Sequence, residues 1–208
     1  MGEYPLVMYP DRTLVLPPAY CGSIRRYAAM AAFGNAVIDT SRRFNKREKE
    51  THRCVISGPN GSQRLTVPLE KTAEWHSTRL CDVKVSTHGE WWNVHWGAIC
   101  SAYGRTPFFE YYADDLLPAF TGKIESLAEL DGMIDRFCRR ALGIKEADPA
   151  QLDQENMTTR LPEVTDAPYY QIWAERFGFI PDLSVLDLIF NMGPESPLVL
   201  QRMLGGNS

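Results

Sequence analysis

His95 is the residue of this sequence best suited to acid–base chemistry. It shares adjoining faces of an expected helix over Trp91–Tyr103 with three tryptophans, so that its imidazole lies among aromatic rings. Burial in such surroundings keeps an imidazole neutral, because desolvation penalises the charged form. Beside an open cleft, a neutral imidazole acts as a general base, whereas inside a core it donates one hydrogen bond. The sequence leaves both interpretations of His95 open.

A basic segment, residues 42–53, ends at Arg53 directly before an apolar run. Its basic residues are interrupted by Glu48 and Glu50, so the segment is not a polybasic tract. It is either a solvated connector or an anion-facing loop that opens into a pocket. In the second case Arg53 is the innermost charge of the loop, and its planar guanidinium can hold a carboxylate or phosphate through paired hydrogen bonds.

Other common catalytic patterns are missing from the sequence. Glu110 and Asp114 lie one turn apart on an expected helix, with Asp115 beside them, where they form either a divalent-cation site or, as is more usual for such a run, a solvated acidic face. The four histidines show no metal-ligand spacing, so no metal site is predicted. The chain also contains no nucleophile elbow, no activated cysteine context and no phosphate-binding glycine loop. The cofactor therefore stays unknown.

Composition narrows the class of protein. With 208 residues, 44% of them hydrophobic and 23% charged, the chain is expected to form one globular domain over residues 1–208. A net charge of −4 argues against a nucleic-acid partner, and no apolar stretch approaches the roughly 20 residues of a membrane-spanning helix. Five widely spaced cysteines without a Cys-x-x-Cys pair indicate reduced thiols and a cytoplasmic location. The expected partner is a small-molecule substrate, and the oligomeric state stays open.

The N-terminal elements that would position these residues predict a βαβ unit. Thr13–Leu16 is expected to be a strand, a helix to run from a Ser23 cap to Gly34, and Ala36–Asp39 to be a second strand. The crossover makes the two strands parallel and brings their carboxyl ends to one edge, where ligands favour binding.

Tyr20 follows the first of these strands, and the segment that ends at Arg53 follows the second. These two residues are therefore expected to line one cleft.

The rest of the chain predicts a mixed sheet and then helices. Cys54–Ser57 and Arg64–Pro68 flank an Asn-Gly turn and indicate a hairpin, and Leu80–Ser86 alternates as a further strand does. Helical segments are expected at Trp91–Tyr103, Glu110–Phe120, Leu127–Leu142, Tyr169–Phe177 and Leu183–Phe190, with a long loop over residues 146–167. The predicted fold class is α/β: a single domain with a mixed sheet of about five strands that starts with a βαβ unit and is followed by a helical C-terminal half.

Several segments, in this order along the chain, resemble the WbqC-like family. They are Leu16–Tyr20, Asn60–Gly61 with Leu65–Pro68, His88–Trp91 with His95–Trp96, Ser101–Tyr103 with Pro107–Asp115, Pro168–Gln171 and Pro181–Asn191. The resemblance covers most of the chain. It implies a link to O-antigen and surface polysaccharide biosynthesis, and a transferase that moves glycine or another acyl group to an activated sugar.

The resemblance also implies a set of functional residues. Tyr20 and His95 would be catalytic, as an orienting hydroxyl and a general base, and the substrate-binding residues would be Arg53, Tyr103, Gln171, Asp182 and Asn191. His52, next to Arg53, is a further substrate-binding candidate of this chain. At His52 the family often has asparagine, so the arginine is retained while the amide beside it is replaced.

A rival interpretation is a non-enzymatic binding or assembly protein. Eight aromatic residues lie between Trp91 and Tyr112, and they form either core or an interaction surface. An enzyme is expected to show one pocket on which Tyr20, Arg53 and His95 converge, and a binding protein a flat apolar patch.

Overall fold

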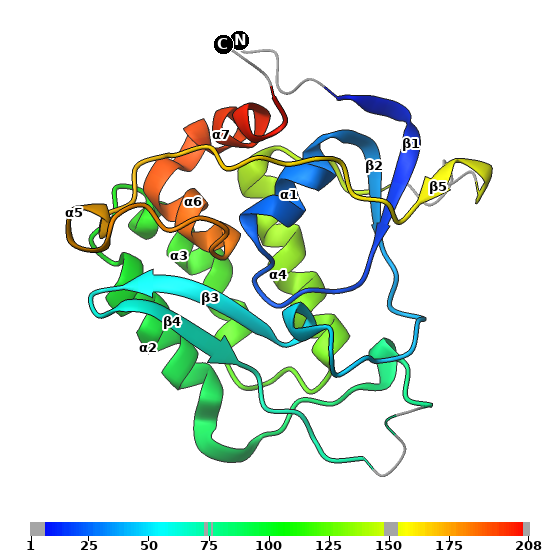
Figure 1. The fold of residues 1–208 in the computed structure, drawn as a ribbon. Coiled ribbons are helices and arrows are strands. Elements are labelled where there is room, and N and C mark those ends of the chain that lie inside the picture. The colour runs from blue at the N-terminus through cyan, green and yellow to red at the C-terminus, as the bar shows by residue number, and fades with distance from the viewer. Residues whose placement is uncertain (1–6, 73–74, 76, 148–153, 206–208) are drawn as a thin grey trace.

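A computed structural model describes residues 7–72, 75, 77–147 and 154–205. The chain is a mixed α/β protein with a parallel sheet of three strands, a separate antiparallel pair, and helices in its C-terminal half (Figure 1). The predicted fold class is therefore confirmed. Within the described residues, five strands form two sheets: β2 (Phe33–Ile38), β1 (Tyr9–Leu16) and β5 (Met157–Thr158) in this order, and β3 (Arg53–Gly58) with β4 (Gly61–Thr66).

The predicted βαβ unit is present. β1 (Tyr9–Leu16) leads into α1 (Ile24–Ala31), and β2 (Phe33–Ile38) returns parallel to β1. Ser23 caps α1 as expected, because its hydroxyl accepts a hydrogen bond from the Arg26 amide at 3.3 Å.

Gly34 lies within β2 rather than at the end of the helix, which corrects the predicted stop signal. A Cβ on Gly34 would come within 2.4 Å of the Pro10 carbonyl oxygen, so this glycine allows the two strands to approach each other.

The predicted hairpin forms the second sheet. β3 (Arg53–Gly58) pairs antiparallel with β4 (Gly61–Thr66), and Gly61 takes the positive φ of 94° that the turn requires. The expected strand over Leu80–Ser86 is absent, because Leu80–Asp82 is a 3-10 helix and the residues that follow make only isolated bridges.

Three helices follow the hairpin along the chain. α2 (Trp91–Tyr103) and α4 (Leu127–Leu142) have their predicted bounds, while α3 (Phe109–Leu116) continues as a 3-10 helix over Leu117–Phe120. α2 lies against β3, and α4 lies at the centre of the molecule against α6 (Val185–Met192) (Figure 1). Three short 3-10 helices join these elements to the rest: Lys49–Thr51, His88–Glu90 and Gln154–Asn156.

The C-terminal segment returns to the core, as its helical spacing predicted. β5 (Met157–Thr158) adds to the other side of β1 within the region expected to be a loop. α5 (Ala174–Phe177) is shorter than predicted, α6 is Val185–Met192, and α7 (Ser196–Met203) follows a 3-10 turn over Gly193–Glu195 and packs on α1.

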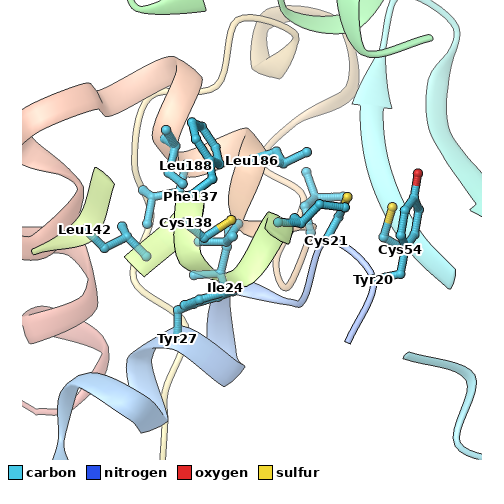
Figure 2. Packing of buried hydrophobic residues seen from close by; sticks show 14 of the residues in the cluster. Tyr20, Cys21, Ile24, Tyr27, Cys54, Phe137, Cys138, Leu142, Leu186 and Leu188 are labelled. Carbon is cyan, nitrogen blue, oxygen red and sulfur yellow. The ribbon is translucent and has the colours of Figure 1, made fainter. Parts of the chain in front are cut away.

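α6 is buried at seven of its eight positions, so this late element is central to the core. Figure 2 shows Leu186 and Leu188 of α6 near Phe137 and Cys138 of α4, with Ile24 of α1 beneath them.

Candidate functional site

A pocket of about 450 Å³ lies where the hairpin meets the segments that precede α1 and α6; we call it the arginine pocket. Its lining consists of ten residues, most of them polar or charged: Cys21, Ser23, Lys49, Glu50, Arg53, Cys54, Val55, Arg64, Asp182 and Ser184. They come from segments far apart in the sequence, so the pocket exists only in the folded chain.

Backbone hydrogen bonds hold three of these segments together. Ser23 and Ser184 form an isolated antiparallel bridge, in which the Ile24 amide donates to the Leu183 carbonyl at 3.0 Å. The Ser184 amide in turn donates to the carbonyl of Val55 on β3 at 2.7 Å. The cap of α1, the start of α6 and the hairpin are thereby fixed relative to one another around the pocket.

Backbone strain is concentrated in the same place. Cys21 has a φ of 45° and Asp182 a φ of 53°, and Glu90 is the one other non-glycine residue with positive φ among the described residues. The left-handed conformation costs such residues about 1 kcal/mol or more each, and strain of this kind tends to persist at functional sites. The two strained residues both line the arginine pocket.

Arg53 supplies a charge that the protein itself does not fully bind. It is the first residue of β3, half-buried, and its Nε is buried without a hydrogen-bond partner. Lys49 and Arg64 line the same pocket as further cations. A guanidinium with a free donor, beside two more cations, can hold a carboxylate or phosphate.

Two carboxylates, Glu50 and Asp182, limit this positive charge. Glu50 Oε1 accepts a hydrogen bond from the Ser23 amide at 2.9 Å. Asp182 Oδ1 accepts one from the Arg25 amide at 3.4 Å, and its Oδ2 lies 3.9 Å from Arg25 Nε. Burial raises the pKa of Asp182 against the opposing influence of Arg25. The pocket therefore holds both anion-binding groups and a carboxylate that can accept a proton.

The two residues of the predicted catalytic pair, Tyr20 and His95, form a hydrogen bond with each other inside the protein. The Tyr20 hydroxyl lies 2.7 Å from His95 Nδ1, and the ring of Trp91 packs edge-on against the imidazole. Burial lowers the pKa of His95 to about 4, so its imidazole is neutral at physiological pH, as the sequence predicted. Neither residue lines the arginine pocket. They lie behind it, because Tyr20 precedes Cys21 in the chain and neighbours Cys54 (Figure 2).

His52, adjacent to Arg53, faces a different cavity. It is buried, its Nδ1 lies 3.2 Å from Thr51 Oγ1, and its ring packs on Phe44. This cavity of about 280 Å³ shares Arg53 and Lys49 with the arginine pocket. Burial, helped by the charges of Arg53 and Lys49, lowers the pKa of His52 to about 4.

The remaining polar candidates, Tyr103, Gln171 and Asn191, bond within the core. The Tyr103 hydroxyl accepts from the Ser57 amide at 3.4 Å, and the Gln171 side chain bonds both the amide and the carbonyl of Ile180 at 2.9 Å.

Asn191 accepts from the Ile172 amide at 3.0 Å and donates to the carbonyl of Asp187 at 2.7 Å. Such contacts tie the segment before α5 to α6, and Tyr103, Gln171 and Asn191 do not line the arginine pocket.

A scan against protein-family models matched residues 27–147 to the WbqC-like protein family, which is more than half of the chain. The chain belongs to the WbqC-like family. The searches of curated proteins and of solved structures returned no match.

The WbqC-like match covers part of the arginine pocket. Arg53 and its hairpin lie inside the matched range, whereas Cys21, Ser23 and Asp182 lie outside it. The pocket of this WbqC-like protein is therefore completed by segments from both ends of the chain.

The sequence did not predict several of the residues that line the arginine pocket of this WbqC-like protein. Glu50 and Lys49 belong to the segment of residues 42–53, for which the sequence left open a solvated connector or an anion-facing loop, so a signal for them was present. The sequence contains no such signal for Arg64, because it is one of several exposed polar residues on β4. It faces the pocket only because it pairs with Val55. Cys21 and Cys54 lie side by side at the pocket (Figure 2). Burial raises the pKa of Cys21, so it is a thiol rather than a reactive thiolate at neutral pH.

The WbqC-like structure shows the places of two groups of residues for which the sequence left alternatives open: the aromatic residues between Trp91 and Tyr112, and the acidic residues of α3. Of the eight aromatic residues between Trp91 and Tyr112, Tyr111 is the exposed one, at 77%, and the other seven are buried or half-buried. Glu110, Asp114 and Asp115 are exposed on α3. Within the described part of the chain no group of three or more histidine, cysteine or acidic residues has metal-binding geometry, and no helix there is long and apolar enough to span a membrane.

Proposed function

We propose that this WbqC-like protein is a cytoplasmic transferase that binds a small anionic substrate in the arginine pocket and moves glycine or a related acyl group to an activated sugar for surface polysaccharide synthesis. The observation that carries the anionic substrate is the Arg53 guanidinium, whose buried Nε has no protein partner beside a pocket with two further cations. The acyl group and the sugar rest on the family resemblance.

The pocket residues can be given roles in such a transfer. Arg53 would bind the carboxylate or phosphate of the substrate and orient it. Asp182 would take the proton that an attacking amine or hydroxyl loses when it forms the new bond to the acyl carbon, as the leaving group departs. Its raised pKa favours this role, because a general base works best when its pKa approaches the working pH.

Tyr20 and His95 stay in the proposal with a changed role. Because they lie behind the pocket, they would position the loop that carries Cys21 and Ser23 rather than contact the substrate. A direct role of His95 as general base stays a prediction. The cytoplasmic location is supported by five cysteines that are all free.

The test is thermal unfolding of the full chain with glycine, acetyl-CoA, UDP-glucose and UDP, for the wild type and Arg53→Ala. A ligand at 100 times its Kd adds about 2.7 kcal/mol to the unfolding free energy. We expect at least one of these ligands to stabilise the wild type, and Arg53→Ala to weaken its binding about tenfold or more, since a hydrogen bond to a charged group contributes about 1.5–3 kcal/mol. Arg53→Lys should recover only part of the binding, because it keeps the charge and loses the planar fork.

The matched control is Arg12→Ala, an exposed arginine on β1 outside the pocket, which should bind like the wild type. Equal binding by Arg53→Ala and the wild type would remove the pocket from the proposal. If none of the ligands stabilises the protein while a protein partner is recovered with it, the binding-protein interpretation is the better one.

A further inference from the structure

A second, larger pocket adjoins the arginine pocket at the edge of the parallel sheet; we call it the sheet-edge pocket. It has a volume of about 550 Å³. Val15 and Leu16 at the carboxyl end of β1 line it, and so does Thr159, which directly follows β5. In Figure 1 this edge lies where β1 and the chain after β5 pass α1.

The position of this pocket follows a general rule of open parallel sheets. The order β2-β1-β5 places the crossover partner of β1 on one side and a strand from far along the chain on the other. Ligands of such sheets bind outside the carboxyl ends of the strands at the point where the strand order changes direction. The sheet-edge pocket occupies that point, between the ends of β1 and β5.

Arg26 supplies a buried positive charge to this pocket. Its side chain is 6% exposed, its Nη2 donates to the Pro17 carbonyl, and its Nε has no partner. None of the ion pairs found among the described residues includes Arg26. Gly22 makes room for it, because a Cβ there would lie 2.7 Å from Arg26 Cδ.

The buried acid whose pKa responds to Arg26 forms no ion pair with it. Asp131 of α4 is 1% exposed, and both of its carboxylate oxygens are without a hydrogen-bond partner. Burial raises the pKa of Asp131 well above its usual range even though Arg26 opposes the rise, so the acid favours its neutral form. A guanidinium buried without an ionised partner is costly, and a bound anion would offset this cost.

The other arginines of this pocket are engaged elsewhere. Arg25 pairs with Asp166 at 2.5 Å, and Arg42 pairs with Glu48 at 2.8 Å. Arg26 is therefore the arginine left for a ligand.

Part of the sheet-edge pocket is apolar, beside its charged residues Glu48, Lys49, Glu50 and Asp182. Pro17 and Pro18 lie on the side of β1, while Leu161, Pro162 and Val164 come from the segment after β5. Rigid proline rings and aliphatic side chains on two sides suit the faces of a flat ring. A ligand that fits both the charge and these walls carries its anionic group on a ring.

The two pockets adjoin each other. Four residues line both of them: Ser23, Lys49, Glu50 and Asp182. Groups held in the two pockets would therefore lie next to each other at this shared wall.

We propose that the sheet-edge pocket is a second ligand site, which takes an anionic group carried on a flat ring, as in a nucleoside phosphate, with Arg26 as the anchor of the anion. This inference deepens the proposed function and rests on it in one respect: a donor and an acceptor would occupy the two pockets together. The binding itself can be tested without any transfer reaction.

The experiment is isothermal titration of the full chain with phenyl phosphate and with UDP, on the wild type and on two variants at Leu161. Leu161 is 54% exposed at the rim, so neither variant disturbs the core. Leu161→Asp should weaken both probes about tenfold through repulsion of their phosphate, an effect that grows as the salt concentration is lowered. Leu161→Asn, of the same shape without the charge, loses only the aliphatic contact, so it should weaken both probes less than Leu161→Asp and without the salt dependence.

The third variant is Arg26→Gln, whose folding is checked by circular dichroism. The folded variant should no longer bind either probe. Phenol and inorganic phosphate separate the two parts of the ligand, and each should bind more weakly than phenyl phosphate. Phosphate that binds as tightly as phenyl phosphate would show that the ring is not recognised and would overturn the proposed ligand class.

The two pockets are distinguished by Arg53→Ala. We expect this variant to bind phenyl phosphate as the wild type does. Binding that is lost in Arg53→Ala and unchanged in Leu161→Asp would place the phosphate in the arginine pocket, which overturns the second site and leaves the proposed function standing. A wild type that binds neither probe at millimolar concentration also overturns the second site, whereas the proposed function is then judged by glycine, acetyl-CoA and UDP-glucose.

Discussion

Two buried histidines, His95 and His52, are expected to make the stability of this protein depend on pH. Burial lowers the pKa of both His95 and His52 from 6.5 to about 4. His95 is also bonded to Tyr20, so its neutral form is part of the wall behind the arginine pocket. Protonation of these imidazoles is therefore expected to oppose folding.

The resulting prediction concerns the pH dependence of unfolding. Between pH 6.5 and 4 the unfolded state binds a proton at His95 that the folded state does not, so the stability from the neutral imidazole is complete above pH 6.5 and declines as the pH falls toward 4. The advantage of the wild type over His95→Gln in urea unfolding should thus be smaller at pH 5 than at pH 7.5. His88→Gln, at an exposed position, controls for the loss of an imidazole. An equal or larger advantage at pH 5 would contradict the burial argument.

For single residues, the sequence predicted the charge or protonation state of a side chain better than its place relative to the pocket. Arg53 was found because a charge directly before an apolar strand must lie near the core. The neutral state of His95 followed from its tryptophan neighbours. Which face of α2 meets the pocket depends on how the helix docks on β3, and this docking is set by contacts between distant segments. Residue type and spacing therefore could not show that Tyr20 and His95 lie behind the pocket.

Among the elements, those with strong local signals were predicted closely. The βαβ unit, the hairpin and the bounds of α2 and α4 follow from hydrophobic period, caps and turn residues. β5 has two residues and exists only through its pairing with β1. The same reason explains why five strands divide into two sheets, because no local pattern states which strands pair.

Glycine positions give a matched test of how tightly elements pack. Gly193, between α6 and α7, has a φ of 50°, and a Cβ there would lie 2.5 Å from the Phe108 ring. Gly193→Ala should lower the unfolding free energy by about 2 kcal/mol or more, from the strained φ and the displaced ring. Gly97→Ala, exposed on α2 with no atom within 4 Å, should instead raise it by about 0.5–1 kcal/mol. Denaturant unfolding measures both changes, and equal effects would mean that the contact with Phe108 is not maintained.

For the whole molecule, the arrangement of the core makes both ends of the chain necessary. β1 is the central strand of the parallel sheet, and α6 is buried against α4. Both pockets need residues from the N-terminal loop and from the segment before α6. The single domain over residues 1–208 stays a prediction, which a fragment can test.

The range that matches the WbqC-like family, residues 27–147, should not fold by itself. It retains β2, the hairpin and the helices α2 to α4, but it lacks β1, so β2 loses the strand to which it pairs. It also lacks α6, so the apolar face of α4 would be exposed to water. Each Å² of uncovered apolar surface costs about 25 cal/mol. This loss is large for a protein whose net stability is only about 5–15 kcal/mol. The purified fragment is expected to show little near-ultraviolet circular dichroism and no cooperative transition in urea. The full chain should unfold in one step, with tryptophan fluorescence and far-ultraviolet circular dichroism changing together. A fragment that unfolds cooperatively would instead make residues 27–147 a domain and the two termini additions to it.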